Sequence, residues 1–183
     1  NIPTLFYYSH IPAMVIGLIA GIIVFRKMKE ASIGAWLLVI TGLFFLWGFF
    51  DLLLWATNDP RVVLFFWTIQ ILIEPLIFLA ALFMSYGFLF RKQISFKSTL
   101  ILALSVVPLI VFLSTSYTLI GVSISDCNAI EGFFAHYYTY ILEAIYILSI
   151  LVCAFSAYRQ SINIKRRPEI KFFTVGIILF LLS

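Results

Sequence analysis

The chain has 183 residues and a formal net charge of +4, and 63% of its residues are hydrophobic, 18% aromatic and only 11% charged. Its mean hydropathy is +1.12. Soluble domains carry roughly 25% charged residues, so this composition excludes a soluble globular domain and indicates a membrane protein. No basic stripe interleaved with aromatic residues is present, and we therefore expect no nucleic-acid partner.

Apolar runs of membrane-spanning length follow one another along the whole chain. A helix needs roughly 20 apolar residues to cross ~30 Å of hydrocarbon. We therefore predict an all-α fold, a polytopic membrane helix bundle that forms one domain over residues 1–183. The predicted spans are about 5–25, 32–56, 62–90, 98–116, 133–158 and 171–183. Pro108 predicts a kink in the fourth span, and residues from Thr115 to about Glu131 are predicted to form a polar outer loop.

All but one of the twelve Lys and Arg residues fall into three short patches between these runs. The patches are Arg26, Lys27 and Lys29; Arg91, Lys92 and Lys97; and Arg159, Lys165, Arg166, Arg167 and Lys171. Short loops rich in Lys and Arg stay on the cytoplasmic side of a membrane. We therefore predict that the three patches are cytoplasmic and that the N-terminus and the turn with Arg61 lie outside.

Both ends of the sequence suggest a fragment of a larger domain. The chain begins with Asn1 rather than Met, and residues 172–183 would form a helix only about 18 Å long, too short to cross. The sixth span is thus expected to be incomplete. Cys127 lies in the outer loop and Cys153 late in the fifth span, so we expect them to be too far apart for a disulfide.

Three carboxylates lie inside the predicted spans. Counted from the outer end of each helix, Asp51 is about 8 Å deep, Glu74 about 18 Å and Glu143 about 15 Å. Charged residues within spans are costly and usually face the bundle interior or a watery cavity. All three acids are therefore predicted to lie in the outer half of the membrane.

Each of these acids shares one helix face with aromatic or polar neighbours, three or four residues apart. The three faces consist of Trp47, Asp51 and Trp55; of Trp67, Gln70 and Glu74; and of His136, Tyr140 and Glu143. If the faces converge, they form an outward-opening pocket with apolar walls and few polar groups, the usual composition of a small-ligand site. We predict that these residues bind a small molecule or a lipid.

Structural roles are alternatives for the same side chains. Asp51 is shallow enough to be an interfacial acid. A protonated Glu74 could bond backbone that Pro75 leaves unpaired, and Glu143 could bond a neighbouring helix. His10 and His136 could respond to pH or bind a metal, but a position at the membrane interface is favoured. The sequence has no catalytic motif, and no cofactor is expected.

A family resemblance rests on the order of these features. They are an outside N-terminus, aromatic-rich spans that end in short basic loops, the sequence Phe-Leu-Trp-Gly-Phe-Phe-Asp at 45–51, and Asp-Cys-Asn-Ala-Ile-Glu-Gly at 126–132 before a Tyr-rich span. The chain resembles the N-terminal seven-helix membrane region of bacterial sensor histidine kinases. It lacks a seventh span, a phosphoacceptor His region and a kinase domain, and the resemblance assigns no residue a role.

The resemblance implies a sensor of an external or membrane-borne cue that relays it to a cytoplasmic output such as a histidine kinase. It also implies the bacterial cytoplasmic membrane and is compatible with a homodimer. A small-solute or proton-coupled transporter is the alternative, because Glu74 and Pro75 lie near the midplane of one helix. A rhodopsin-like photoreceptor is disfavoured, since every Lys lies at a cytoplasmic edge and none lies deep in a span.

Overall fold

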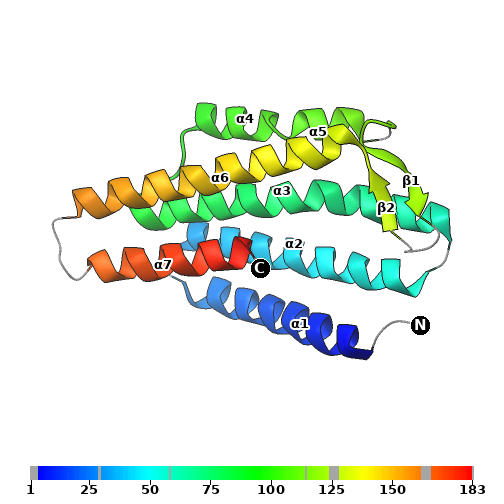
Figure 1. Cartoon of the computed structure of the whole chain (residues 1–183). Coiled ribbons are helices and arrows are strands. Elements are labelled where there is room, and N and C mark those ends of the chain that lie inside the picture. Colours follow the sequence, from blue (N-terminus) through cyan, green and yellow to red (C-terminus); the bar gives the residue numbers. More distant parts are fainter. Residues whose placement is uncertain are drawn as a thin grey trace.

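The computed structural model describes residues 4–28, 30–57, 59–113, 115–123, 128–161 and 166–182. The chain is mostly helical (Figure 1). Its long helices are α1 (Thr4–Lys27), α2 (Ala31–Ala56), α3 (Pro60–Phe90) and α6 (Phe133–Gln160). The shorter elements are α4 (Phe96–Leu104), α5 (Val107–Phe112), α7 (Arg166–Leu181) and the strands β1 (Leu119–Ser123) and β2 (Asn128–Glu131).

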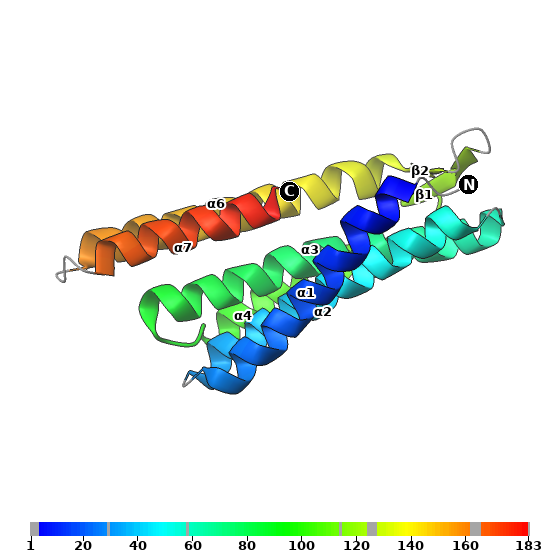
Figure 2. The ribbon, with the colours of Figure 1, turned by 90° about the horizontal axis from the view of Figure 1, so that it is seen from below.

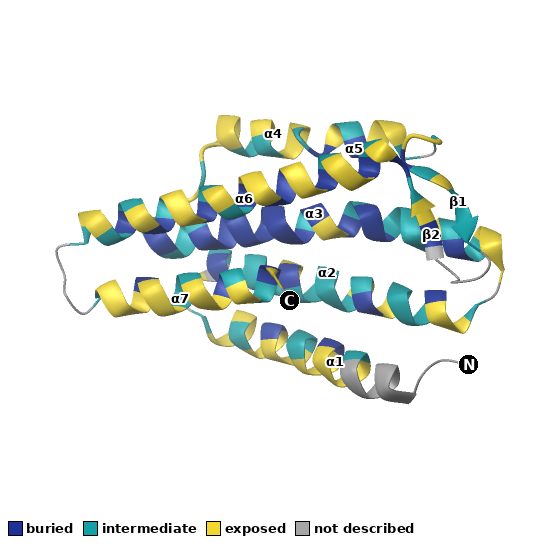
Figure 3. Cartoon of the chain, viewed as in Figure 1, coloured by how far each residue is buried: buried dark blue, intermediate teal, exposed yellow. Residues whose placement is uncertain are grey.

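The helices form layers around α3. Helices α6 and α7 lie side by side on one side of α3, and α1 and α2 lie on the other (Figure 2). Most of the C-terminal half of α3 is buried, including Ala81 and Ser85, which are fully enclosed. The outer helices α1 and α4 expose most of their described residues, and α7 exposes half of its residues (Figure 3). Helix α3 is therefore the central element of the bundle.

Four of the described helices, α1, α2, α3 and α6, are long and apolar enough to cross a membrane. Large apolar side chains cover their outer surfaces; Ile16 on α1 and Val152 on α6 are 66% and 64% exposed. Contiguous apolar surface of this kind is unusual for a soluble protein and suits contact with lipid. The prediction of long apolar helices that can cross a membrane is therefore confirmed. The number of six spans and their orientation stay predictions.

The bounds of α3 follow from local chemistry. Asp59 accepts a hydrogen bond from the backbone N–H of Arg61 at 2.9 Å, and Pro60 occupies the first turn, where its missing N–H costs nothing. At the other end Arg91 adopts a left-handed conformation with φ of 53°, and its N–H bonds the carbonyl of Gly87. Pro75 lies inside α3 and does not interrupt it.

Residues 96–112 form the apolar helix predicted at 98–116, with a break next to Pro108, where the sequence predicts a kink. Helix α4 ends at Leu104 and α5 begins at Val107, with Ser105 and Val106 between them. Pro108 lacks an N–H and its ring would clash with the carbonyl of Leu104, which ends the helix upstream of the proline. Two tyrosines of α6 hold the break: Tyr146 Oη lies 2.6 Å from Ser105 Oγ, and Tyr138 donates to the Ser105 carbonyl at 2.7 Å.

The predicted outer loop contains a β-hairpin, which corrects the all-α prediction. Strands β1 and β2 pair antiparallel, with an irregularity between Leu119 and Gly121. The hairpin packs against α3. Its end is fixed by Gly132, whose N–H bonds the Thr118 carbonyl at 2.8 Å and whose missing side chain leaves room for the Tyr117 carbonyl. Cys127 lies outside the described residues, and Cys153 is a free thiol.

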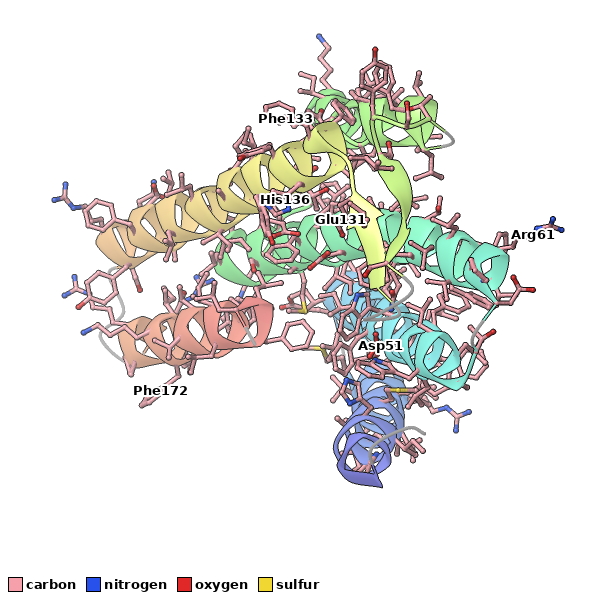
Figure 4. The ribbon with its side chains drawn as sticks, turned by 45° about the vertical axis from the view of Figure 1, so that its right-hand side comes forward. Asp51, Arg61, Glu131, Phe133, His136 and Phe172 are labelled. Carbon is pink, nitrogen blue, oxygen red and sulfur yellow. The ribbon has the colours of Figure 1, made fainter. Side chains whose placement is uncertain are left out.

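Charge separates the two ends of the bundle. The start of α1, the α2–α3 turn and the hairpin lie at one end, which we call the hairpin end (Figure 1). Arg61 projects away from the helices there (Figure 4). At the opposite end, the basic end, lie the described residues of the three basic patches: Arg26, Lys27, Arg91, Lys92, Lys97, Arg159, Arg166, Arg167 and Lys171.

Candidate functional site

A cavity of about 280 Å³ opens between α1, α2, α3 and α7. Its walls are mainly apolar and aromatic, and the charged or titratable side chains on it are His10 and Glu74. A small-ligand site usually has such apolar walls with a few convergent polar groups. The described residues that line it are His10, Ala13, Met14, Phe44, Trp47, Gly48, Glu74, Ile77, Phe78, Phe180 and Leu181.

Polar contacts beside this cavity join the first three helices. His10 Nε2 on α1 lies 3.6 Å from the Asp51 carboxylate on α2. The Gln70 side chain on α3 lies within hydrogen-bonding reach of Asp51 and donates from Nε2 to the Trp47 carbonyl at 3.1 Å. Gln70 is only 7% exposed, so these bonds satisfy a buried amide that would otherwise be costly. The contacts hold α1, α2 and α3 in one arrangement at the cavity.

Glu74 differs from its neighbours on α3. Ile73 and Pro75 are buried, but Glu74 is exposed to the cavity. It also lies near enough to Glu131 and Glu143 for the carboxylates to repel one another. Like charges in a medium of low dielectric constant interact strongly. A cation or a hydrogen-bond donor in the cavity would therefore be attracted to Glu74.

Glu143 contributes a second acidic group behind α3. It lies on α6, is 9% exposed, and its Oε1 atom has no hydrogen-bond partner among the described residues. Thr139, one turn earlier on α6, is 7% exposed and its hydroxyl is likewise unpartnered. A buried polar group without a partner costs roughly 1–3 kcal/mol. The predicted bond from Glu143 to a neighbouring helix is not made by this oxygen.

A second group of contacts connects the hairpin, α3 and α6. Trp67 Nε1 donates to Glu131 Oε1 at 2.9 Å, and His136 Nδ1 lies 3.6 Å from Glu131 Oε2. Tyr140 packs edge-on against the His136 ring. In Figure 4 Glu131 and His136 lie together where the hairpin meets α6. Glu131 thus joins three elements, although its position at the edge of a polar loop gave no sign of this role.

Most of the nine predicted ligand residues belong to two neighbouring groups of contacts. Trp47 and Glu74 line the cavity, and Asp51 and Gln70 support it. Trp67 and His136 bond Glu131 instead, and Glu143 is enclosed behind α3. Trp55 and Tyr140, 44% and 58% exposed, do not line the cavity. The acids of α3 and α6 are close, and of the three predicted faces those of α2 and α3 contribute side chains to the lining of this cavity.

Metal binding has no support in the part of the chain that the structure describes. No group of three or more His, Cys, Asp and Glu side chains there could hold a metal ion. The two histidines instead each face a carboxylate, Asp51 for His10 and Glu131 for His136.

Comparison with protein-family models, with curated protein sequences and with solved structures found no match. The class of protein therefore rests on the fold alone. Four apolar helices of membrane-spanning length indicate a helical membrane protein.

Proposed function

We propose that the chain is a membrane-embedded sensory domain that detects an external or membrane-borne cue and relays it to a cytoplasmic output such as a histidine kinase. In this proposal the chain spans the membrane six times, as part of a seven-helix region, with the hairpin end outside. The observation that carries it is the cavity at Glu74, because its walls come from four different helices.

A ligand in this cavity would contact α7 as well as α1, α2 and α3, which already pack closely against one another. Helix α7 reaches α2 through an edge-to-face contact of Phe180 with Phe44, whose ring centroids are 5.7 Å apart. Both rings line the cavity. A ligand shifts a conformational equilibrium only through different affinities for two states. A ligand that separates the rings of Phe44 and Phe180, or brings them together, would therefore favour one position of α7 over another.

The lining favours a small organic cation as the ligand. Glu74 and the His10–Asp51 pair supply negative charge or acceptors, and none of the described lining residues is Lys or Arg. Phe44, Trp47, Phe78 and Phe180 present aromatic rings, and ring faces attract cations. An anion would meet the carboxylate of Glu74 there, and the basic side chain on the lining, His10, already faces the Asp51 carboxylate.

Equilibrium binding of two small probes to the chain in phosphatidylcholine nanodiscs tests this proposal. Benzylamine is a cation at neutral pH, whereas benzyl alcohol has a similar shape and no charge. Because hydrogen bonds to charged groups contribute roughly 1.5–3 kcal/mol, we expect the cation to bind about tenfold or more tightly. Glu74→Gln should abolish this preference and Glu169→Gln, at the basic end, should keep it. Equal affinities of the native chain for both probes would reject the site.

Proton-coupled transport is a second candidate, favoured by one observation. Glu74 is exposed, and Glu143, whose Oε1 atom has no partner among the described residues, lies near enough to repel it. Ionisable groups within spans often mark proton pathways. Proteoliposomes that carry an internal pH dye and an imposed pH gradient distinguish the two functions. Transport predicts a proton flux that Glu74→Gln removes, and the sensory function predicts no flux above that of empty liposomes.

A further inference from the structure

A polar pocket of about 320 Å³ lies at the basic end, where α3 and α6 end and α7 begins. Lys92 and Arg166 bring positive charge to it. Tyr86, Gln160 and Ser161 add side chains that can donate hydrogen bonds. None of the described residues that line this pocket is acidic. The lining therefore suits an anion that accepts several hydrogen bonds.

The two cations of this pocket have different roles. Arg166 Nη2 donates to the carbonyls of Leu89 at 2.8 Å and Phe88 at 3.4 Å, so its guanidinium is tied to the last turn of α3. Lys92 is exposed and has no ion pair among the described residues. Arg166 builds the wall of the pocket, and Lys92 is the cation with bonding capacity left for a ligand.

The surroundings of this pocket have the layout of a membrane boundary. Arg159 lies over the Phe155 ring at 4.5 Å, and Arg167 and Lys171 lie over Tyr158 at 5.3 and 5.2 Å. Nearer the middle of the bundle, α6 presents exposed apolar side chains, including Val152, which is 64% exposed. Long basic side chains at such a boundary keep their charges in the headgroup layer.

The acids at this end lie on the other side of Arg166. Glu30 and Glu169 line a separate, smaller pocket together with Arg91 and Arg166, and Glu30 lies 4.0 Å from Arg91. They therefore do not neutralise Lys92. A polar pocket with a cation that has no ion pair among the described residues, at the end of apolar helices, matches a molecule with an anionic head and apolar chains.

We propose that this α3–α6–α7 pocket binds the phosphate of an anionic phospholipid, with the acyl chains along the exposed apolar face of α6. Basic pockets between membrane helices on the cytoplasmic side recognise such headgroups. The bound headgroup would bridge the end of α3 and the start of α7, the same junction that Arg166 bonds. This proposal is independent of the cavity at Glu74.

Electron spin resonance of spin-labelled lipids tests the proposal on the full chain in phosphatidylcholine vesicles. The fraction of immobilised label gives the affinity for phosphatidylglycerol relative to phosphatidylcholine. We expect the native chain to prefer phosphatidylglycerol about fivefold for each basic residue that contacts it. Lys92→Gln should lower this preference about fivefold, and Lys92→Arg should retain it.

Lys97→Gln is the matched control, because Lys97 is an exposed lysine at the same end that does not line the pocket. It should leave the preference unchanged. Equal losses in Lys92→Gln and Lys97→Gln would show attraction by overall charge and would overturn the site. Loss of the preference on addition of millimolar inorganic phosphate, at constant ionic strength, would show a site for free phosphate and would also overturn it. Helical circular dichroism confirms that each variant is folded.

Discussion

The two ends of the bundle use their polar side chains in different ways. At the hairpin end, side chains from different elements bond one another, as in Trp67 with Glu131 and His10 with Asp51. At the basic end, cations bond backbone carbonyls or lie over rings, as Arg166 does with Leu89 and Arg159 with Phe155. The side-chain pair at this end, Arg91 with Glu30, is long at 4.0 Å and exposed. This difference indicates at which end the helices can adopt more than one arrangement.

Side-chain pairs and backbone bonds differ in how readily they change. A cation on the carbonyls at a helix end satisfies groups that have no partner within the helix. Removing the cation therefore leaves these carbonyls without a partner in the protein. A pair of side chains can exchange one partner for a ligand of similar chemistry. We therefore expect the basic end to be the fixed support and the hairpin end, whose side-chain pairs can change partners, to be the part that responds.

Gly132→Ala should have the largest effect on the hairpin end. A Cβ atom at this position would collide with the backbone carbonyl of Tyr117, which cannot move without breaking the junction of the hairpin and α6. We expect a loss of roughly 2–3 kcal/mol in the free energy of unfolding, the upper range for overpacking. Unfolding by sodium dodecyl sulfate in mixed micelles measures it.

Gly121→Ala is the control for this substitution, since a Cβ at Gly121 would meet no atom within 4 Å. It should change the free energy by less than about 0.5 kcal/mol. Equal effects of the two substitutions would contradict the close approach at Gly132.

Arg166→Gln tests the fixed support at the basic end. It removes the charged donor to the Leu89 and Phe88 carbonyls, and bonds to charged groups contribute roughly 1.5–3 kcal/mol. Because Arg166 is partly exposed, we expect the free energy of unfolding to fall by an amount near the lower limit of this range. Arg167→Gln, which removes an exposed ring contact and a long, exposed bond of 3.3 Å to the Ser161 carbonyl, should cost less than about 1 kcal/mol. The same unfolding assay ranks them, and a reversed order would refute the role of Arg166.

Trp67→Phe should have the smallest effect of the three. It keeps the ring but removes the N–H that donates to Glu131, at a cost of roughly 1 kcal/mol. Trp36→Phe serves as its control, because Trp36 packs against Phe83 and makes no side-chain hydrogen bond within the described residues. If both variants unfold alike, the Trp67–Glu131 bond does not hold the hairpin to α3.

The sequence predicted the long helices because their signals are local and strong. Uninterrupted apolar runs mark α1, α2, α3 and α6, and their observed bounds differ from the prediction by a few residues at most. The hairpin was missed because its strands of five and four residues are too short for an alternating pattern to stand out in a Ser-rich segment. Pro108 predicted an irregularity in the helix. Helix α4 ends one turn earlier, next to Ser105, because the proline ring clashes with the backbone of the preceding turn.

The site was harder to predict, because the rotation of each helix decides which side chains meet. Of the predicted α2 face, Trp47 lines the cavity, whereas Trp55 lies too near the end of α2 to reach it. His10 meets Asp51, and Glu131 meets Trp67, only because segments that are distant in the sequence come together in the fold. Spacing along one helix carries no information about such contacts.

Movement of α7 when the cavity is occupied tests the central claim most directly. Spin labels at Leu46 on α2 and Val175 on α7, both exposed, report the distance between these helices by double electron–electron resonance in nanodiscs. We predict that saturating benzylamine shifts or narrows this distance distribution and that benzyl alcohol, at the same concentration, does not. The shift should disappear in Glu74→Gln. An unchanged distribution in the native chain with benzylamine bound would contradict the account.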